Sequence, residues 1–357
     1  MIFIMSREKT DKSGKRKNIN IKYLAKVADV SPSTVSRALR GDPSANKKTA
    51  DRILKIARDL NYYPNLLAKG LRDKKTKTIG IILNDLKNPL YYETIKVIGD
   101  TLNDLDYTMI LCDSNYDLKL ERKNIINMLS KGVDGIIISP VNIKSENITL
   151  IMEEDLKTVY IDFAPEFENI NYVHVSHEHA GYVATEYLIK KGHKSIMLLN
   201  GPFQLSVSKD FLKGYMQALM NNSITVKRSL VKYTELSIEG GYEVMKRLYS
   251  ANNSKKFFDF SAVLSLSDML AIGVYEASKE IGFKIPDDLS VIGYDDIFMS
   301  SYLSPPLTTI HAPKVRTGKL CIQILLDQIE NRDKEFHKII LDTRLIERDS
   351  VKDLSIK

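Results

Sequence analysis

The side chains best suited to chemistry in this sequence follow apolar runs of strand character. Runs such as TIGIIL, DGIIIS and TVYID end in, or are followed by, short polar residues. The residues at these strand ends are Asn84, Asp85, Asp113, Ser114, Ser139, Asp162, Ser267, Asp268, Tyr294, Asp295 and Asp296. Such groups, gathered at one edge of a sheet, suit a polyhydroxylated or amine-bearing ligand. An Asp after a strand is also a good helix cap, so each single carboxylate has two interpretations.

A second group of polar side chains lies near the N-terminus, in SPSTVSRALRG. Ser31 can cap a helix whose first residue is Pro32. The exposed edge of that helix carries Pro32, Ser33, Ser36 and Arg37. Short side chains allow close approach to a DNA groove, and the guanidinium of Arg37 can form two hydrogen bonds with a guanine edge. Ser31, Ser33 and Asn46 are further candidates for phosphate or base contacts.

The net charge is distributed unevenly along the chain. Residues 1–78 carry 20 Lys+Arg and 7 Asp+Glu, a net charge of +13, whereas the remaining 279 residues carry 32 and 38, a net charge of −6. This asymmetry predicts that the front of the chain meets a polyanion and that the rest does not. Residues 1–18, which include KSGKRK, are expected to form a disordered basic arm that attracts DNA without reading its sequence.

Three short helices are expected to present the N-terminal polar residues. In NIKYLAKVADVSPSTVSRALRG the apolar positions fit two helices that pack at a steep angle, with Asp29 in the turn between them. A third helix, capped by Asn46, ends before Pro64. Cap, spacing and charge together favour a helix-turn-helix DNA-binding domain over residues 19–64, and an ordinary three-helix bundle with a basic face is the alternative. Residues 65–76 have helical spacing but are too few for a stable helix, so we expect a hinge, with a plain linker as the alternative.

Beyond the hinge the sequence alternates strand-like runs with amphipathic helices. This rhythm predicts an α/β core of two similar lobes, each a doubly wound parallel sheet with helices on both faces. The second set of strands is expected to begin near Val173. The expected first lobe contains residues 77–176 and 308–336, and the expected second lobe contains residues 177–305 and 337–357.

Composition and motifs disfavour several other classes of protein. No apolar run approaches the length of about 20 residues that a membrane span needs, and residues 1–5 make a poor secretory signal. Neither Cys112 nor Cys321 sits beside a His or in a CxxC spacing, so no disulfide framework or nucleophile is expected. No GxGxxG follows a strand, and Walker and GxSxG motifs are missing, which disfavours an α/β enzyme and a nucleotide cofactor. The cluster VHVSHEH straddles a strand and a helix without a partnering Cys, which disfavours a metal site.

Several segments of the chain resemble the LacI/GalR family of bacterial transcription regulators. They are VSPSTVSRAL, LNYYPN followed by AKGLR, KKGHKSIMLLNGP, LSLSDMLAIG, SVIGYDD, PPLTTIHAP and RLIERDSV, in this order from residue 19 to about 350. The resemblance implies an all-α head and a core like that of periplasmic binding proteins, in a homodimer whose heads bind half-sites of an operator. It implies a cytoplasmic repressor without a cofactor, controlled allosterically by a small molecule, with a sugar or related metabolite favoured. No leucine heptads follow Arg348, so a dimer is expected rather than a tetramer.

The resemblance also implies roles for individual residues. It places DNA contacts at Ser31, Pro32, Ser33 and Arg37 in the recognition helix, at Asn46 and Tyr62 near the DNA backbone, and at Ala68 and Leu71 in the hinge, where Leu71 is the intercalating leucine. It places effector contacts at Asn84, Leu90, Tyr91, Ser139, Asp162, Leu205, Phe211, Leu236, Ser267 and Asp295. Asp295, in GYDD, is the single residue that we favour most.

Two effector positions depart from the family pattern. Phe211, in KDFLKGY, stands where members commonly have an arginine, and Leu205 stands where the purine-sensing member has one. An aromatic ring in place of the arginine guanidinium points toward a sugar whose face stacks on Phe211, or toward a less polar ligand. The other alternative is that the protein has no small effector. Induction and corepression both stay open. An exported sugar-binding protein is the main rival class, but it would have no use for SPSTVSRAL.

Overall fold

The computed structural model describes residues 19–62, 75–142, 144–163, 167–251, 258–332 and 335–356. The chain divides into two compact units, residues 1–76 and 77–357. No helix in these described ranges combines the length and the apolar character that crossing a bilayer requires.

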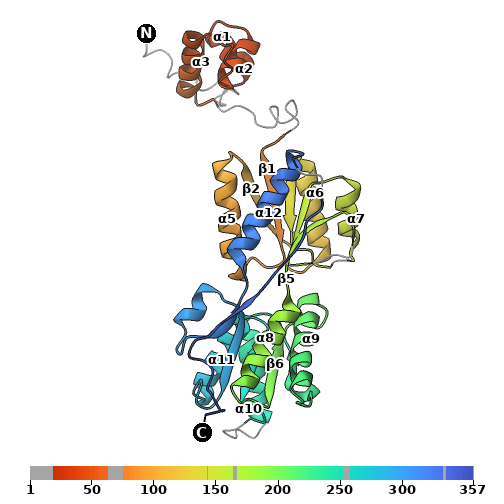
Figure 1. Ribbon diagram of the computed structural model, residues 1–357. Coiled ribbons are helices and arrows are strands. Elements are labelled where there is room, and N and C mark those ends of the chain that lie inside the picture. The colour runs from red at the N-terminus through yellow and green to blue at the C-terminus, as the bar shows by residue number, and fades with distance from the viewer. Residues whose placement is uncertain are drawn as a thin grey trace. The chain divides into compact units, whose positions relative to one another are not determined.

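Within residues 19–62, the described part of the N-terminal unit, three helices pack as a bundle (Figure 1). They are α1 (Ile21–Val27), α2 (Pro32–Leu39) and α3 (Lys47–Asp59). Each begins after a residue whose side chain accepts a hydrogen bond from a first-turn N–H, and these caps are Asn20, Ser31 and Asn46. Asp29 occupies the turn between α1 and α2 with φ of 51°. The core holds Leu24, Ala25, Ala28, Val35, Ala38, Ile53 and Ala57. The predicted caps of α2 and α3 are therefore confirmed.

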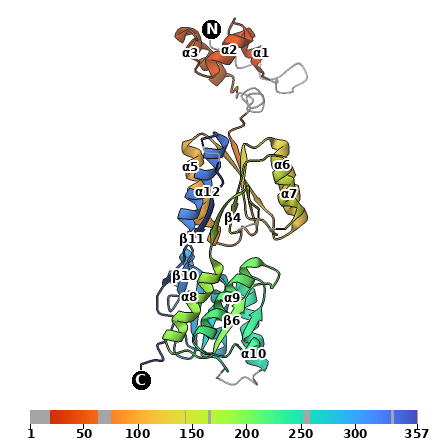
Figure 2. The same ribbon diagram turned by 45° about the vertical axis from the view of Figure 1, so that its right-hand side comes forward.

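The first lobe is built on a parallel sheet with the strand order β11-β5-β4-β3-β1-β2. Its strands are β1 (Thr78–Leu83), β2 (Thr108–Asp113), β3 (Gly135–Ile138), β4 (Thr158–Ile161), β5 (Asn171–Val175) and β11 (Lys338–Leu341). Its helices are α5 (Leu90–Asp104), α6 (Leu118–Lys131), α7 (Glu146–Glu153) and α12 (Lys314–Ile329). Figure 2 shows α5 and α12 over one face of the sheet and α6 and α7 over the other. Alternate residues of β1 feed two separate cores, with Ile79 and Ile81 under α5 and α12 and Ile82 under α6 and α7.

The second lobe has a sheet with the strand order β12-β10-β9-β8-β6-β7. Its strands are β6 (Ile196–Asn200), β7 (Val231–Tyr233), β8 (Ala262–Ser265), β9 (Ser290–Asp295), β10 (Thr308–His311) and β12 (Arg344–Ile346). Its helices are α8 (His177–Lys190), α9 (Ser206–Asn221), α10 (Ile238–Ala251) and α11 (Asp268–Ile281), with short 3-10 turns η2 (Arg228–Leu230) and η3 (Phe298–Tyr302). All neighbouring strands are parallel except β12, which is antiparallel to β10. The sequence predicted a parallel sheet in the second lobe, and this prediction is wrong for β12.

The strand pairing corrects the predicted start of the second set of strands and two of the predicted lobe assignments. The strand around Val173 pairs with β4, so it belongs to the first sheet and does not open the second set. β10 pairs with β9, which moves residues 308–311 to the second lobe, although α12 after it packs against α5 in the first. β11 pairs with β5, which moves residues 338–341 to the first lobe. The chain therefore passes between the lobes after β5, after β10 and after β11, and a local sequence pattern does not encode such crossings.

Candidate functional site

The exposed edge of α2 gathers the side chains predicted to contact DNA. The exposed residues are Ser31, Pro32, Ser33 and Arg37, and Ser36 beside them is partly buried. Val35 and Ala38, on the other side of the helix, are buried in the core of the head. The helix therefore presents a polar edge on a packed support, which is the arrangement that a recognition helix in a major groove requires.

Hydroxyl groups at the start of α2 hold one another in place. Ser31 Oγ accepts a hydrogen bond from the backbone N–H of Thr34 at 3.1 Å and lies 2.7 Å from Ser33 Oγ. Asn46 has a comparable role in α3, because its Oδ1 accepts the N–H of Thr49 at 3.3 Å. Ser31 and Asn46 thus cap helices in this structure, and a DNA contact would have to share these side chains.

Three of the predicted DNA contacts lie at or beyond the end of the described head. Tyr62 is partly buried and packs against the core of the head. Ala68 and Leu71, predicted for the hinge, lie outside the described residues.

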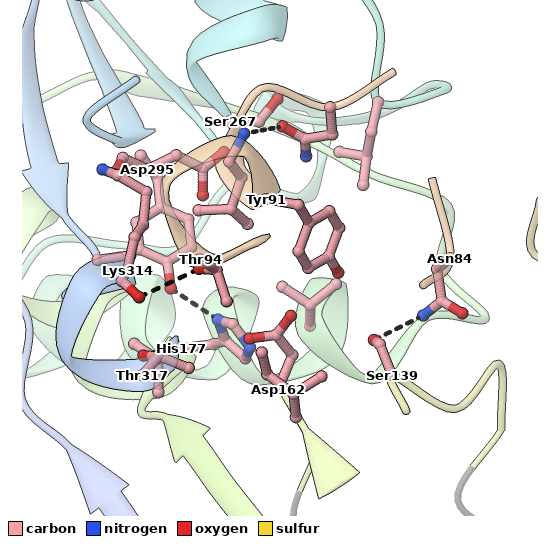
Figure 3. A pocket seen from close by; sticks show the side chains of 18 of the residues that line it. Asn84, Tyr91, Thr94, Ser139, Asp162, His177, Ser267, Asp295, Lys314 and Thr317 are labelled. Carbon is pink, nitrogen blue, oxygen red and sulfur yellow. Dashed lines mark hydrogen bonds between the residues drawn. The ribbon is translucent and has the colours of Figure 1, made fainter. Parts of the chain in front are cut away.

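The core unit contains a cavity between its two lobes, at the carboxyl ends of several strands. Most of the predicted effector residues line it: Asn84, Leu90, Tyr91, Ser139, Asp162, Leu205, Leu236, Ser267 and Asp295. Figure 3 shows Asn84, Tyr91 and Asp162 from the first lobe and Ser267 and Asp295 from the second around the same space. Both lobes therefore contribute side chains to one site.

Asp162 follows β4 and turns its chain with φ of 64°. Burial raises the pKa of its carboxyl to about 6, although a hydrogen bond from Tyr91 opposes the shift. Figure 3 shows Asp162 close to His177. A carboxylate that is costly to ionise without a ligand is a strong acceptor for ligand hydroxyl or amine groups.

Asp295 ends β9 in a conformation that a non-glycine residue seldom adopts, with φ of 116°. Burial raises the pKa of its carboxyl well above the usual range, and the charges of Asp268 and Asp162 add to this rise while Lys314 opposes it. Lys314 Nζ donates to the backbone carbonyl oxygens of Asp295 and Asp296, both at 2.8 Å. Strained backbone of this kind is tolerated where the surrounding structure fixes it, and it is concentrated at functional sites.

The neutral polar residues of the cavity are held by hydrogen bonds. Asn84 Nδ2 donates to Ser139 Oγ at 3.0 Å, and Asn84 Oδ1 accepts from Ser114 Oγ at 3.1 Å. Ser267 caps α11 by accepting the N–H of Leu270 at 3.2 Å. These bonds fix the directions in which the amide and the hydroxyl groups meet a ligand.

Four strand-end carboxylates do not line the cavity. They form hydrogen bonds or ion pairs with backbone and side-chain groups near them instead. They are Asp85, Asp113, Asp268 and Asp296. Asp268 accepts three hydrogen bonds, including one from the Ser300 hydroxyl at 2.6 Å. Asp296 pairs with Arg348 at 2.7 Å. Asp85 and Asp113 accept N–H groups of the turns that follow them. None of these four caps a helix, since Asp117 and Ser267 cap α6 and α11, so the predicted capping role is wrong for them and they stabilise turns and side chains nearby instead.

Phe211 does not line the cavity. Its side chain is fully buried in the core of the second lobe, and its ring centroid lies 5.5 Å from that of Tyr294. Tyr294, unlike Phe211, does line the cavity, and its hydroxyl lies 2.9 Å from His177 Nδ1. The expectation that a ligand stacks directly on Phe211 therefore does not hold in this structure, because other core side chains already cover the ring.

Several residues line the cavity although the sequence did not predict them to contact a ligand. Among them are Asn88, Thr94, Tyr116, His177, Lys314 and Thr317. Thr94, Lys314 and Thr317 lie near the starts of α5 and α12, which meet the cavity. Burial lowers the pKa of His177 to about 3, so its ring is neutral. Among the described residues no three His, Cys, Asp or Glu side chains are placed to hold a metal.

Known proteins match the chain along nearly its whole length. Residues 20–65 match the family described as bacterial regulatory proteins, lacI family, and residues 185–351 match the periplasmic binding protein-like domain. The HTH-type transcriptional repressor PurR of Photobacterium profundum is 33% identical over 337 residues, which cover 94% of this chain and 99% of that protein. The chain belongs to the lacI family of bacterial regulatory proteins. As a lacI-family member it is a DNA-binding transcriptional regulator, and family members are regulators rather than enzymes.

Other lacI-family proteins are similar in sequence and fold. The ribose operon repressor of Haemophilus influenzae is 30% identical, with 93% of this chain and 98% of that protein covered. The lac repressor dimer bound to operator and the anti-inducer ONPF superposes with a TM-score of 0.82 at 24% identity, covering 94% of this chain and 100% of that one. A LacI family regulator from Enterococcus faecium with bound ribose has a TM-score of 0.69 at 28% identity, and the match covers 78% of this chain and 99% of that chain. The two-lobed core with its helix-turn-helix head is thus the lacI-family fold.

Proposed function

We propose that this lacI-family regulator is a cytoplasmic homodimeric repressor that binds operator DNA through α2. We further propose that a neutral sugar, bound between the two lobes, sets its operator affinity. The observation that carries the sugar assignment is a cavity lined from both lobes that contains the two carboxylates of Asp162 and Asp295 and, among the residues that the structure describes, no arginine.

The charges of the cavity disfavour an anionic ligand. A phosphate or carboxylate group is usually held by the two parallel hydrogen bonds of an arginine, and no arginine in the described part of the chain lines this site. Lys314 is the lysine among the lining residues, and its ammonium already donates to two backbone carbonyls. Hydroxyl donors can instead satisfy Asp162 and Asp295, while the rings of Tyr91 and Tyr294 offer apolar faces to a sugar ring. The relatives named for ribose support this class.

The regulation follows from the position of the cavity. A ligand that contacts both lobes binds more tightly to one arrangement of the lobes than to another. This difference in affinity increases the population of the arrangement that binds it more tightly. The same coupling changes the affinity for operator by an equal factor, since linkage is reciprocal. The direction of the change, induction or corepression, is an outcome of the experiment below.

The test measures operator affinity of the full chain with neutral sugars, sugar phosphates and amino sugars, after the operator has been selected from random duplexes. We expect a neutral sugar to change the affinity. Asp295→Asn should abolish this response and leave operator binding intact, because Asn keeps the shape but not the charge. Asp113→Asn is the matched control, since Asp113 also ends a strand but does not line the cavity, and it should keep the response. A response only to a sugar phosphate, or a full response in Asp295→Asn, would contradict the proposal.

A further inference from the structure

Lys314 is a buried lysine at the point where the chain passes from β10 of the second lobe to α12 of the first. It is the first residue of α12, it lines the cavity between the lobes, and its side chain is 2% exposed. A buried ammonium is stable only when it is paired or hydrogen-bonded. In the described part of the chain it forms an ion pair with Glu93 on α5, but the distance of 3.7 Å from Nζ to Oε1 is too long for a hydrogen bond. The ammonium therefore depends on other acceptors.

These acceptors are backbone carbonyl groups of the second lobe. Lys314 Nζ donates to the carbonyl oxygens of Asp295 and Asp296, both at 2.8 Å. The two residues form a turn with φ of 116° and 54°. A non-glycine residue with positive φ costs free energy and persists only where its surroundings fix it. Lys314 supplies a fixing contact at both residues.

The two side chains of this turn have different surroundings. The carboxylate of Asp296 accepts a hydrogen bond from Arg348 at 2.7 Å and lies 2.8 Å from His311 Nδ1. Asp295 instead lines the cavity (Figure 3). The direction of its side chain depends on the two planar peptide groups that flank its Cα atom, and the hydrogen bond from Lys314 fixes one of these planes. Lys314 thus helps to set the direction in which the Asp295 carboxylate meets a ligand.

The backbone of Lys314 is held by the first lobe. Its carbonyl oxygen accepts a hydrogen bond from the hydroxyl of Thr94, a buried residue of α5, at 3.1 Å. The two helices lie close together here, because a Cβ atom on Gly318 of α12 would be 2.8 Å from the carbonyl oxygen of Thr94. Closely packed helices move as one body. Lys314 is therefore fixed to the first lobe by its backbone and to the second lobe by its ammonium.

We propose that Lys314 is a positioning residue that ties the direction of the Asp295 carboxylate to the arrangement of the two lobes. In the arrangement of this structure the ammonium holds the turn, and the carboxylate is directed into the cavity. Another arrangement of the lobes separates Nζ from the two carbonyl groups, so the turn relaxes, and Glu93 stays close to the released ammonium. The second lobe then presents its complete ligand-binding surface in only one arrangement.

This inference rests on the proposed function in one respect, that the effector contacts Asp295. It makes Lys314 the residue through which the arrangement of the lobes controls the affinity for effector. A ligand held by Asp295 in turn favours the arrangement in which Lys314 reaches the turn, since the two equilibria are linked.

The first test needs no effector and compares crystal structures of the full chain and of Lys314→Met. Methionine keeps an unbranched side chain but has no donor, so we expect Asp295 to lose its positive φ and its carboxylate to turn out of the cavity. Lys314→Gln is a second, milder variant in case Lys314→Met does not fold. Its amide ends one atom earlier than the ammonium and cannot reach both carbonyl groups, so the same change is expected. An unchanged turn at Asp295 and Asp296 in either variant would overturn the proposal.

The second test measures the binding of D-ribose, a neutral sugar, by calorimetry at a temperature where every variant is folded. Lys314→Met should bind D-ribose at least about tenfold more weakly, because a hydrogen bond to a charged group contributes enough free energy for a factor of this size. Lys319→Met is the matched control, since Lys319 lies on the same helix but is exposed and does not line the cavity. It should bind D-ribose as the unchanged protein does.

The two tests separate this inference from its alternatives. A role of Lys314 in stability alone would lower the melting temperature of Lys314→Met but leave its affinity for D-ribose unchanged, and that result would overturn the proposal. If the unchanged protein does not bind D-ribose, the sugar assignment fails for this ligand, whereas the crystal structures still decide whether Lys314 positions Asp295.

Discussion

Among the single residues, Asp162 and Asp296 differ most clearly in the sign of their effect on stability. The pKa of Asp162 is raised to about 6 by burial, whereas hydrogen bonds from His311 and Arg348 lower the pKa of Asp296 to about 2. An unfolded Asp has a pKa of about 3.9. Between about pH 4 and 6 the folded chain holds more protons than the unfolded chain at Asp162, so this residue lowers the free energy of unfolding as pH rises through that window. Asp296 adds stability above about pH 4 and loses it as pH falls toward 2.

The first prediction uses this contrast. Asp162→Asn removes the cost of ionising a buried carboxyl and keeps an acceptor for Tyr91, so its melting temperature relative to the unchanged protein should rise between pH 4 and 7. Asp296→Asn should show the opposite trend and lose most stability at pH 7. Thermal unfolding at several pH values measures both differences. Parallel curves for the two variants would show that the environment of Asp162 is misassigned.

The second prediction concerns Arg37. Its side chain is exposed on α2 beside Ser33, so Arg37→Ala should cost about 1–3 kcal/mol on the correct operator and should reduce discrimination against one base pair. Competition binding with single-base operator variants measures this loss. Arg58→Ala, at the end of α3, should change the affinity for all duplexes equally. Discrimination that survives Arg37→Ala would mean that another element enters the groove.

Local chemistry explains how much of the site the sequence could predict. Asp162 and Asp295 were accessible to prediction because both end strands, and the carboxyl ends of parallel strands meet at one edge. The same rule also selected Asp268 and Asp296, because it does not say which way a side chain turns. Phe211 was placed at the ligand by position in the family, but the packing of the second lobe covers its ring.

At the scale of elements, two helix pairs in the second lobe approach closely through glycines. A Cβ atom on Gly214 of α9 would lie 1.9 Å from the carbonyl oxygen of Glu178 on α8, and one on Gly181 would lie 2.3 Å from that of Phe211. The same relation holds between α10 and α11, where Gly273 faces the carbonyl oxygen of Ile238 at 2.1 Å. A side chain at these positions would force the backbones apart.

The third prediction tests this contact. Gly214→Ala should lower the free energy of unfolding by about 1–3 kcal/mol, since α8 and α9 cannot stay in place. Gly99→Ala, in α5, is the matched control, because its Cβ would meet only Met109 Cε at 3.7 Å. The control should be neutral or stabilising by up to about 1 kcal/mol, from helix propensity. Urea unfolding measures both. Equal midpoints for the two variants would refute the close contact.

The elements also show where prediction from sequence stops. Strands with an apolar run, such as β1 and β3, were predicted almost to the residue as TIGIIL and DGIIIS, because they are buried on both faces and their composition is correspondingly apolar. β11 and β12 are short, and each pairs with a strand far away in the chain. The lobe to which each of them belongs is decided by the strand it pairs with, which the local sequence does not reveal. The prediction from sequence therefore assigned β11 to the wrong lobe.

At the scale of the whole molecule, the charge asymmetry separates attraction to DNA from the reading of DNA. The basic front of the chain contains both α2, with its exposed Arg37, and residues 1–18, which hold six Lys+Arg and two Asp+Glu. Each phosphate contact that a basic residue makes releases counterions, so affinity falls with salt by a slope that counts those contacts. Contacts to phosphate strengthen binding to every duplex and carry no direct sequence information.

The last prediction follows from this division of roles. Deleting residues 1–18 should weaken binding to operator and to unrelated duplexes by the same factor and should flatten the dependence of log affinity on log salt, because only phosphate contacts are lost. The ratio of operator to unrelated affinity should stay constant, whereas Arg37→Ala should lower that ratio with a smaller change in salt slope. Titrations at several salt concentrations with both duplexes measure the slope and the ratio for each variant. If the deletion lowers the ratio, the N-terminal residues contact base edges, and sequence recognition then extends beyond the three helices of the head.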